Sequence, residues 1–219
     1  MNTDPALKAL VLAGLDREPM VNAAHIGVTV RDGLVTLSGH VESYWQKRAA
    51  EQAVSRVKGV KAIAEEITVR LPVEVARNDE EIAAAVVNRL EWDGSVPLDA
   101  VKVQVSGGHV TLSGNVAQAY QRAAAVAAVQ PLWGVLSIAN EIAVMSPPAK
   151  PANPDLIADD IRRALNRGWF AADTVHVAAR GGTVTLSGSA TTLRDRDLAV
   201  ATAWAAPSTM IVENHIRIS

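Results

Sequence analysis

The sequence predicts an α+β fold made of three tandem αββαβ domains, each a three-stranded mixed sheet with two helices on one face. Two observations carry this prediction. The tetrapeptide Thr-Leu-Ser-Gly occurs at residues 36–39, 111–114 and 185–188, so its glycine returns after about 75 residues. Around each occurrence, apolar residues recur first with helical spacing and then alternate as in strands. We therefore expect three domains of one kind, at residues 1–71, 78–145 and 153–219.

The first element of each unit is predicted to be a helix. Its start is indicated by an N-cap residue before proline, or by the spacing of a capping box, at Asp4-Pro5, Asn153-Pro154 and Asn78 with Glu81. Apolar residues then recur every three or four positions: Leu7, Leu10 and Val11; Ile82, Val86 and Leu90; Ile157, Ile161 and Leu165.

A β-hairpin is predicted to follow. In the first unit Ile26, Val28 and Val30 alternate before the turn, and Val35 and Leu37 alternate after it. The two residues between such strands adopt positive φ in a tight turn, which suits Asp32-Gly33, Gly107-Gly108 and Gly181-Gly182. We expect the glycine of each Thr-Leu-Ser-Gly to mark the end of the second strand.

The last two elements are predicted to be an alanine-rich helix and a closing strand. The helix is expected near Tyr44–Val57, Tyr120–Val129 and Leu193–Trp204, and alanine lets it lie close to a sheet. A right-handed crossover through this helix would return the last strand parallel to a hairpin strand. Gly59 and Gly134 follow the helix in two units, and the third unit has Ser208 there.

These motifs together resemble the BON domain, a bacterial module named after OsmY and nodulation proteins. The resemblance covers nearly the whole chain and rests on the repeated hairpins, on Asn140 and Asn214 near the last strands, and on the motif glycines Gly33, Gly39, Gly59, Gly108, Gly114, Gly134, Gly182 and Gly188. It implies the αββαβ fold, a setting of osmotic or envelope stress, and binding of phospholipid or a membrane surface. Some members self-associate, which implies a possible homo-oligomer.

Composition narrows the classes of function. The chain has no cysteine, so disulfides, thiolate metal sites and cysteine nucleophiles are excluded. Its net charge is −2, without the basic excess that drives general nucleic-acid binding. Residues 72–146 hold 8 acidic and 4 basic side chains, which makes the middle unit the acidic one. Because no signal-like segment is visible, we expect a cytoplasmic protein, or a periplasmic one if a leader was removed.

No residue constellation indicates catalysis, a metal or a cofactor. Ser38, Ser113 and Ser187 lack the flanking glycine pattern of a nucleophile elbow, and their repetition favours a structural role. The double glycines are flanked by strands, unlike a phosphate-binding loop that opens a helix. The five histidines occupy five different positions of the aligned units, without a metal-ligand spacing. We therefore expect a non-enzymatic protein.

One basic and aromatic cluster stands out at the end of the third unit's first helix. Its residues, Arg162, Arg163, Arg167, Trp169 and Phe170, suit insertion at a membrane interface with arginines on anionic headgroups. The alternative is that these rings, like Trp92, Trp133 and Trp204, cap the cores or pack between units, which a chain with 4% aromatic residues favours. A second functional hypothesis is a scaffold that binds itself or a protein partner through exposed sheet edges.

Overall fold

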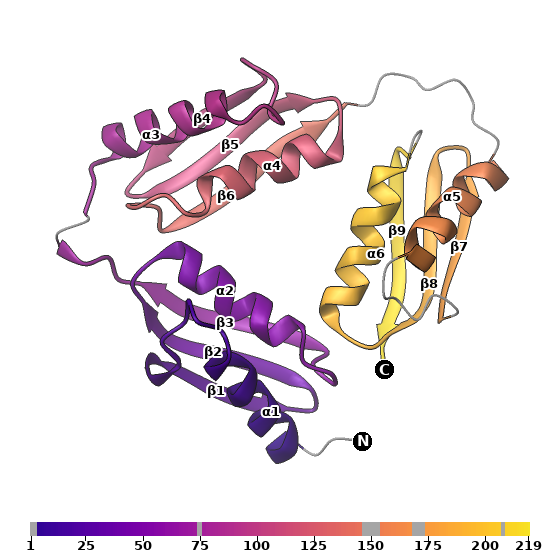
Figure 1. The fold of residues 1–219 in the computed structure, drawn as a ribbon, viewed down its shortest axis with the longest axis horizontal. Coiled ribbons are helices and arrows are strands. Elements are labelled where there is room, and N and C mark those ends of the chain that lie inside the picture. The colour runs from indigo at the N-terminus through magenta and orange to yellow at the C-terminus, as the bar shows by residue number, and fades with distance from the viewer. Residues whose placement is uncertain (1–3, 74–75, 146–153, 168–173, 207–208) are drawn as a thin grey trace.

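The computed structural model describes residues 4–73, 76–145, 154–167, 174–206 and 209–219, and shows three units of one fold (Figure 1). The first contains α1 (Asp4–Asp16), β1 (Ile26–Arg31), β2 (Leu34–Val41), α2 (Tyr44–Ser55) and β3 (Ala62–Val69). The second contains α3 (Asp79–Trp92), β4 (Val101–Ser106), β5 (His109–Val116), α4 (Ala119–Val129) and β6 (Ser137–Val144). The third contains α5 (Pro154–Arg167), β7 (Val175–Arg180), β8 (Thr183–Ala190), α6 (Leu193–Ala205) and β9 (Ile211–Ile218).

Each sheet has the hairpin's second strand in the middle. The orders are β1-β2-β3, β4-β5-β6 and β7-β8-β9. In each unit the hairpin is antiparallel and the last strand runs parallel to the central one. The pairing register is the same throughout, since Leu37, Leu112 and Leu186 lie opposite Val28, Val103 and Val177. The predicted α+β class and mixed-sheet topology are thus confirmed.

The cores are small and aliphatic. In the first unit Val35 and Leu37 of β2 are fully buried beneath Val11 of α1 and Val54 of α2, so both helices cover one face of the sheet. The second and third units repeat this arrangement around Leu112 and Leu186. Among the described residues, every large side chain that is fully buried is Leu, Ile or Val.

The hairpin turns have the predicted backbone conformation. Asp32 and Gly33 have φ of 53° and 83°, and the double glycines of the other units behave alike. A carboxylate at the start of the first helix holds the turn. Asp4 accepts a hydrogen bond from the Asp32 backbone N–H at 3.1 Å, and Asp79 accepts from both Gly107 and Gly108, at 2.7 and 2.9 Å. The Asn78–Glu81 capping box is present, whereas Asp4 lies inside α1 as its first residue.

The expectation that the Thr-Leu-Ser-Gly glycine ends its strand is wrong. The strands β2 and β5 run two residues beyond Gly39 and Gly114, to Val41 and Val116. The glycine is needed for another reason: at Gly39, where φ is 121°, an added Cβ would lie 2.1 Å from the His25 carbonyl oxygen. The motif therefore marks a close approach of two backbones within the sheet.

Neighbouring units touch through the starts of their second helices. Leu193, the first residue of α6, is buried to 6% exposure within the core cluster of the first unit. Tyr44, the first residue of α2, packs against the core of the second unit, and burial raises the pKa of its hydroxyl. Tyr44 thus contributes to a contact between the first and second units.

Candidate functional site

The predicted basic cluster lies on the last turns of α5, where its arginines have local partners. Arg162 pairs with Asp159 at 2.5 Å and donates to the Val177 carbonyl at 3.0 Å, while Arg163 pairs with Asp160 at 2.6 Å. Both ion pairs are more than half exposed, so their strength is modest. α5 ends at Arg167, whose side chain lies outside the described residues together with Trp169 and Phe170.

The corresponding end of α3 exposes an aromatic surface. Trp92, the last residue of that helix, is 80% exposed, and Trp133, beyond the end of α4, is 51% exposed. An open groove of about 670 Å³ runs along α3, lined by Ala85, Arg89 and Trp92 among others, and Leu132, beyond the end of α4, lines it as well. The expectation that Trp92 packs against a core or another unit is therefore wrong, whereas Trp133 is half-buried.

The first unit has the same groove between α1 and α2, with a different lining. It measures about 420 Å³, and Leu10, Gly14 and Val57 contribute apolar surface to it. Cationic side chains of Arg17, Arg56 and Lys58 line it as well. The positions of these three cations, counted from the shared leucine of the first helix and from Gly59 and Gly134, hold Trp92, Pro131 and Trp133 in the second unit.

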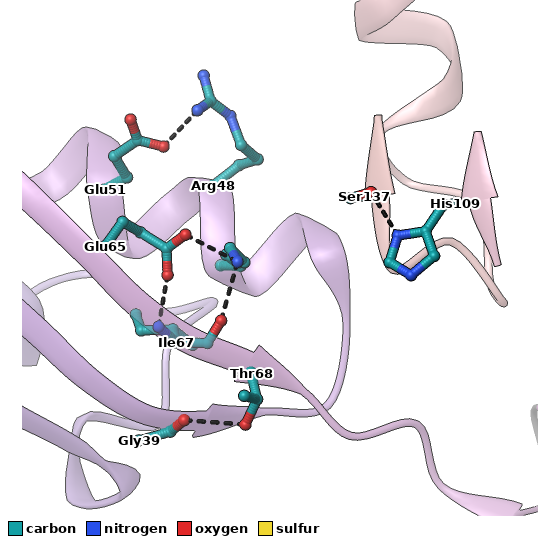
Figure 2. A network of polar contacts seen from close by, with 9 residues as sticks. Gly39, Arg48, Glu51, Glu65, Ile67, Thr68, His109 and Ser137 are labelled. Carbon is teal, nitrogen blue, oxygen red and sulfur yellow. Dashed lines mark hydrogen bonds and ion pairs between the residues drawn. The ribbon is translucent and has the colours of Figure 1, made fainter. Parts of the chain in front are cut away.

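The outer edge of the last strand is closed by side chains (Figure 2). Glu65 accepts from the Ile67 backbone N–H at 2.5 Å, and Lys47 donates to the Ile67 carbonyl at 2.8 Å while pairing with Glu65 at 2.7 Å. In the other units the N–H two residues on is likewise bonded, by Asn140 at 3.1 Å and by Asn214 at 3.0 Å. Asparagine at these positions, noted in the family resemblance, thus has a structural role.

Two contacts made by histidines lack catalytic or metal-binding geometry. The rings of His25 and His40 stack with centroids 4.8 Å apart. Nδ1 of His109 lies 2.7 Å from Oγ of Ser137 (Figure 2), but no described carboxylate is bonded to His109, and Asp79 is occupied by the turn. In the described part of the chain, no three His, Cys, Asp or Glu side chains gather as metal ligands.

The pKa of the Asp79 carboxyl group is lowered in the folded chain. The backbone N–H groups of Gly108 and Gly107 stabilise its charged form and lower its pKa, with a smaller contribution from His109. The charge serves to hold the hairpin, since both carboxylate oxygens are engaged by the turn.

Among the described helices, none has the length and apolarity needed to cross a membrane.

Comparison with known proteins gives a family match and one similar sequence. The family model of the BON domain matches residues 3–70, 78–146 and 153–219. Osmotically-inducible protein Y of Escherichia coli (strain K12) is 31% identical over 143 residues, which cover 64% of this chain and 71% of that protein. Two solved structures of CdsD, a structural protein of the type III secretion system of Chlamydia trachomatis, are each 16% identical. Their TM-scores are 0.28 and 0.27, over 96% and 100% of this chain and 91% and 100% of theirs.

Proposed function

Because this chain belongs to the BON domain family, as an OsmY-like protein with three BON domains, we propose that it binds the surface of a phospholipid membrane without catalysing a reaction. The family is associated with osmotic stress through its osmotically inducible relative. In the proposed role the protein lies on the surface, with side chains entering the headgroup region.

The observation that carries the proposal is the pair of exposed indoles on the second unit. Trp92 and Trp133 are 80% and 51% exposed. Trp92 ends α3, and Trp133 precedes Gly134, which lies against Ile82 near the start of that helix. Indole rings favour the boundary between water and hydrocarbon, because the ring is apolar and its N–H keeps a polar partner. The chain has 5 tryptophans, and these two offer indole surface to a membrane without any rearrangement of the fold.

Charge supports a second contact on the third unit. Arg162, Arg163 and Arg167 lie on two successive turns of α5, and the ion pairs of Arg162 with Asp159 and of Arg163 with Asp160 are exposed. Anionic headgroups can compete for arginines whose ion pairs are exposed, with a gain of about 1 kcal/mol for each cation near the surface. Trp169 and Phe170, two and three residues beyond Arg167, remain part of this proposed contact.

Flotation of the full chain with vesicles tests the proposal. Binding is expected for phosphatidylglycerol-rich vesicles, and Trp92→Ala with Trp133→Ala should reduce the floated fraction severalfold. The triple change of Arg162, Arg163 and Arg167 to alanine should weaken binding mainly at low salt, where unscreened charge matters most.

Matched controls separate membrane contact from folding. Trp45→Ala removes a tryptophan from the first unit, where the ring is 36% exposed, and should leave flotation unchanged. Absence of flotation at any lipid composition or salt concentration would overturn the proposal and favour the scaffold hypothesis. If neither the tryptophan variant nor the arginine variant changed flotation, the proposal of membrane binding would stand, but these residues would be excluded as the membrane contact.

A further inference from the structure

We propose that the groove between α1 and α2 of the first unit binds single-chain anionic amphiphiles: an alkyl chain that carries a carboxylate. This site differs in place and in ligand from the membrane contact proposed above. It binds monomeric molecules from solution, whereas the tryptophans of the second unit are proposed to contact a lipid surface.

The groove has the dimensions and the floor for an alkyl chain. Its volume of about 420 Å³ falls within the range, roughly 300–1,000 Å³, that small-molecule sites occupy. Leu10, Ala13, Gly14 and Val57 supply the apolar surface, and Leu10 is left 47% exposed. Gly14 keeps the groove open, because a Cβ at that position would already lie 3.4 Å from a methyl group of Val57.

The rim of the groove has an excess of positive charge. Arg17, Arg56 and Lys58 line it together with one acid, Glu18. Arg56 contacts Glu18 at 3.7 Å, beyond ordinary hydrogen-bond distance. Within the described residues, Arg17 and Lys58 have neither an ion pair nor a side-chain hydrogen bond. Two uncommitted cations beside an apolar floor match an anionic head followed by an apolar tail.

The second unit shows that the charge is a property of this site and is not required by the fold. Its equivalent groove is larger, about 670 Å³, but of the six residues that line it only Arg89 is cationic. Tryptophan or proline replaces each of the three cations of the first unit. An amphiphile attracted by apolar volume alone would therefore prefer the second unit, and one held by its carboxylate would prefer the first.

Titration of the ¹⁵N-labelled full chain with dodecanoate below its micelle concentration tests the proposal by NMR. Backbone resonances of residues around Leu10, Gly14 and Val57 are expected to shift with saturation. Dodecyltrimethylammonium, with the same chain length and the opposite charge, should bind at least tenfold more weakly at this groove. Acetate, which has the charge without the chain, should cause no saturable shift.

Variants test separately the residues proposed to bind the carboxylate and those proposed to bind the alkyl chain. Arg17→Gln with Lys58→Gln should weaken dodecanoate binding about tenfold, the size expected for losing a charge-assisted hydrogen bond of about 1.5 kcal/mol. Gly14→Leu fills the groove and replaces a glycine inside α1 by a better helix former, so binding should be lost while the fold is kept. Trp92→Ala with Arg89→Gln, in the second unit's groove, should leave the affinity unchanged.

The outcomes separate this site from the membrane proposal. Equal affinity for the two long-chain probes, shifts confined to the second unit, or no saturable shift with dodecanoate would each overturn the inference. Vesicle flotation does not depend on it, because the variants Arg17→Gln and Lys58→Gln leave Trp92 and Trp133 in place. A chain that floats but does not bind dodecanoate would therefore retain the membrane proposal alone.

Discussion

The first and second units place opposite chemistry on the same scaffold. Around the helix pair, Arg17, Arg56 and Lys58 in one unit correspond in sequence to Trp92, Pro131 and Trp133 in the other. The strand registers around Leu37 and Leu112 are nevertheless identical, and a Cβ added at Gly39 or at Gly114 would lie the same 2.1 Å from a carbonyl oxygen. Repeated positions are thus those that the backbone requires, while the helix ends are free to diverge.

The largest effect should come from a position that all units share. Gly114→Ala would place its Cβ 2.1 Å from the Ala100 carbonyl oxygen, at a φ of 125° that suits glycine alone. We expect a loss of about 4 kcal/mol or more, which is comparable with the whole stability of a unit of about 70 residues. Urea denaturation followed by the backbone amide resonances of the second unit in the ¹⁵N-labelled chain measures it.

The control for this change is Gly181→Ala. That glycine also has a positive φ, of 58°, but an added Cβ would find no atom within 4 Å. Only the conformational cost of about 1–2 kcal/mol is expected. Equal losses at Gly114 and Gly181 would show that φ, and not the close backbone approach, explains the repeated motif.

The next effect concerns a side chain of one unit that is buried in the core of another unit. Leu193→Ala removes a side chain of the third unit that is buried in the first unit's core cluster. A loss of about 2 kcal/mol in the contact between these units is expected, with a larger radius of gyration in solution scattering. Leu198→Ala, on the same helix but 50% exposed, should change neither quantity measurably. An unchanged radius for Leu193→Ala would argue against this contact.

A pH-dependent effect should distinguish the carboxylates that hold the hairpins. The pKa of Asp79 is lowered in the folded chain, so its stabilising contribution is complete above the unfolded value of about 4 and is lost as pH falls through the lower folded value. Asp79→Asn should lower the second unit's urea midpoint at pH 7 and flatten its decline between roughly pH 5 and pH 2.

The matched change is Asp4→Asn, because Asp4 accepts one backbone hydrogen bond from the turn where Asp79 accepts two. Its effect at pH 7 should be the smaller of the two. If Asp79→Asn left the acid dependence of the second unit unaltered, the proposed origin of that dependence would be rejected.

The smallest effect is expected at the outer edge of β3. Lys47→Met removes the ammonium that donates to the Ile67 carbonyl and pairs with Glu65, in an ion pair that is partly exposed. About 1 kcal/mol or less should be lost from the first unit, seen as a small fall in its thermal midpoint. Glu66→Gln, at an exposed neighbour without such contacts, provides the baseline.

The features that could be predicted from the sequence are those set by neighbouring residues in the chain. Positive φ at Asp32-Gly33 and the double glycines follows from turn chemistry, and the burial of Leu37 and Val35 follows from alternation. The fate of Trp92 does not follow from such rules, because its exposure depends on how far α4 reaches beside α3. Aromatic scarcity suggested packing, and the short alanine-rich helices instead leave the ring uncovered.

The first unit's groove was beyond sequence reasoning for a similar reason. Arg17 lies beyond the end of α1, and Arg56 and Lys58 lie about 40 residues later, beyond the end of α2. No motif connects them, and only the packing of the two helices brings them to one rim. The contact of Leu193 is equally invisible, because periodicity assigns a residue to a face and does not say which unit covers it.

The side chains that close the last strand have a consequence for folding during synthesis. A chain of like units whose strands share one register offers each central strand several foreign partners, and repeat proteins are prone to such misassembly. Glu65, Asn140 and Asn214 each occupy the outward N–H two residues ahead in their own strand. Once a unit has formed, its third strand has no free donor at that point with which to recruit a strand from the next unit leaving the ribosome.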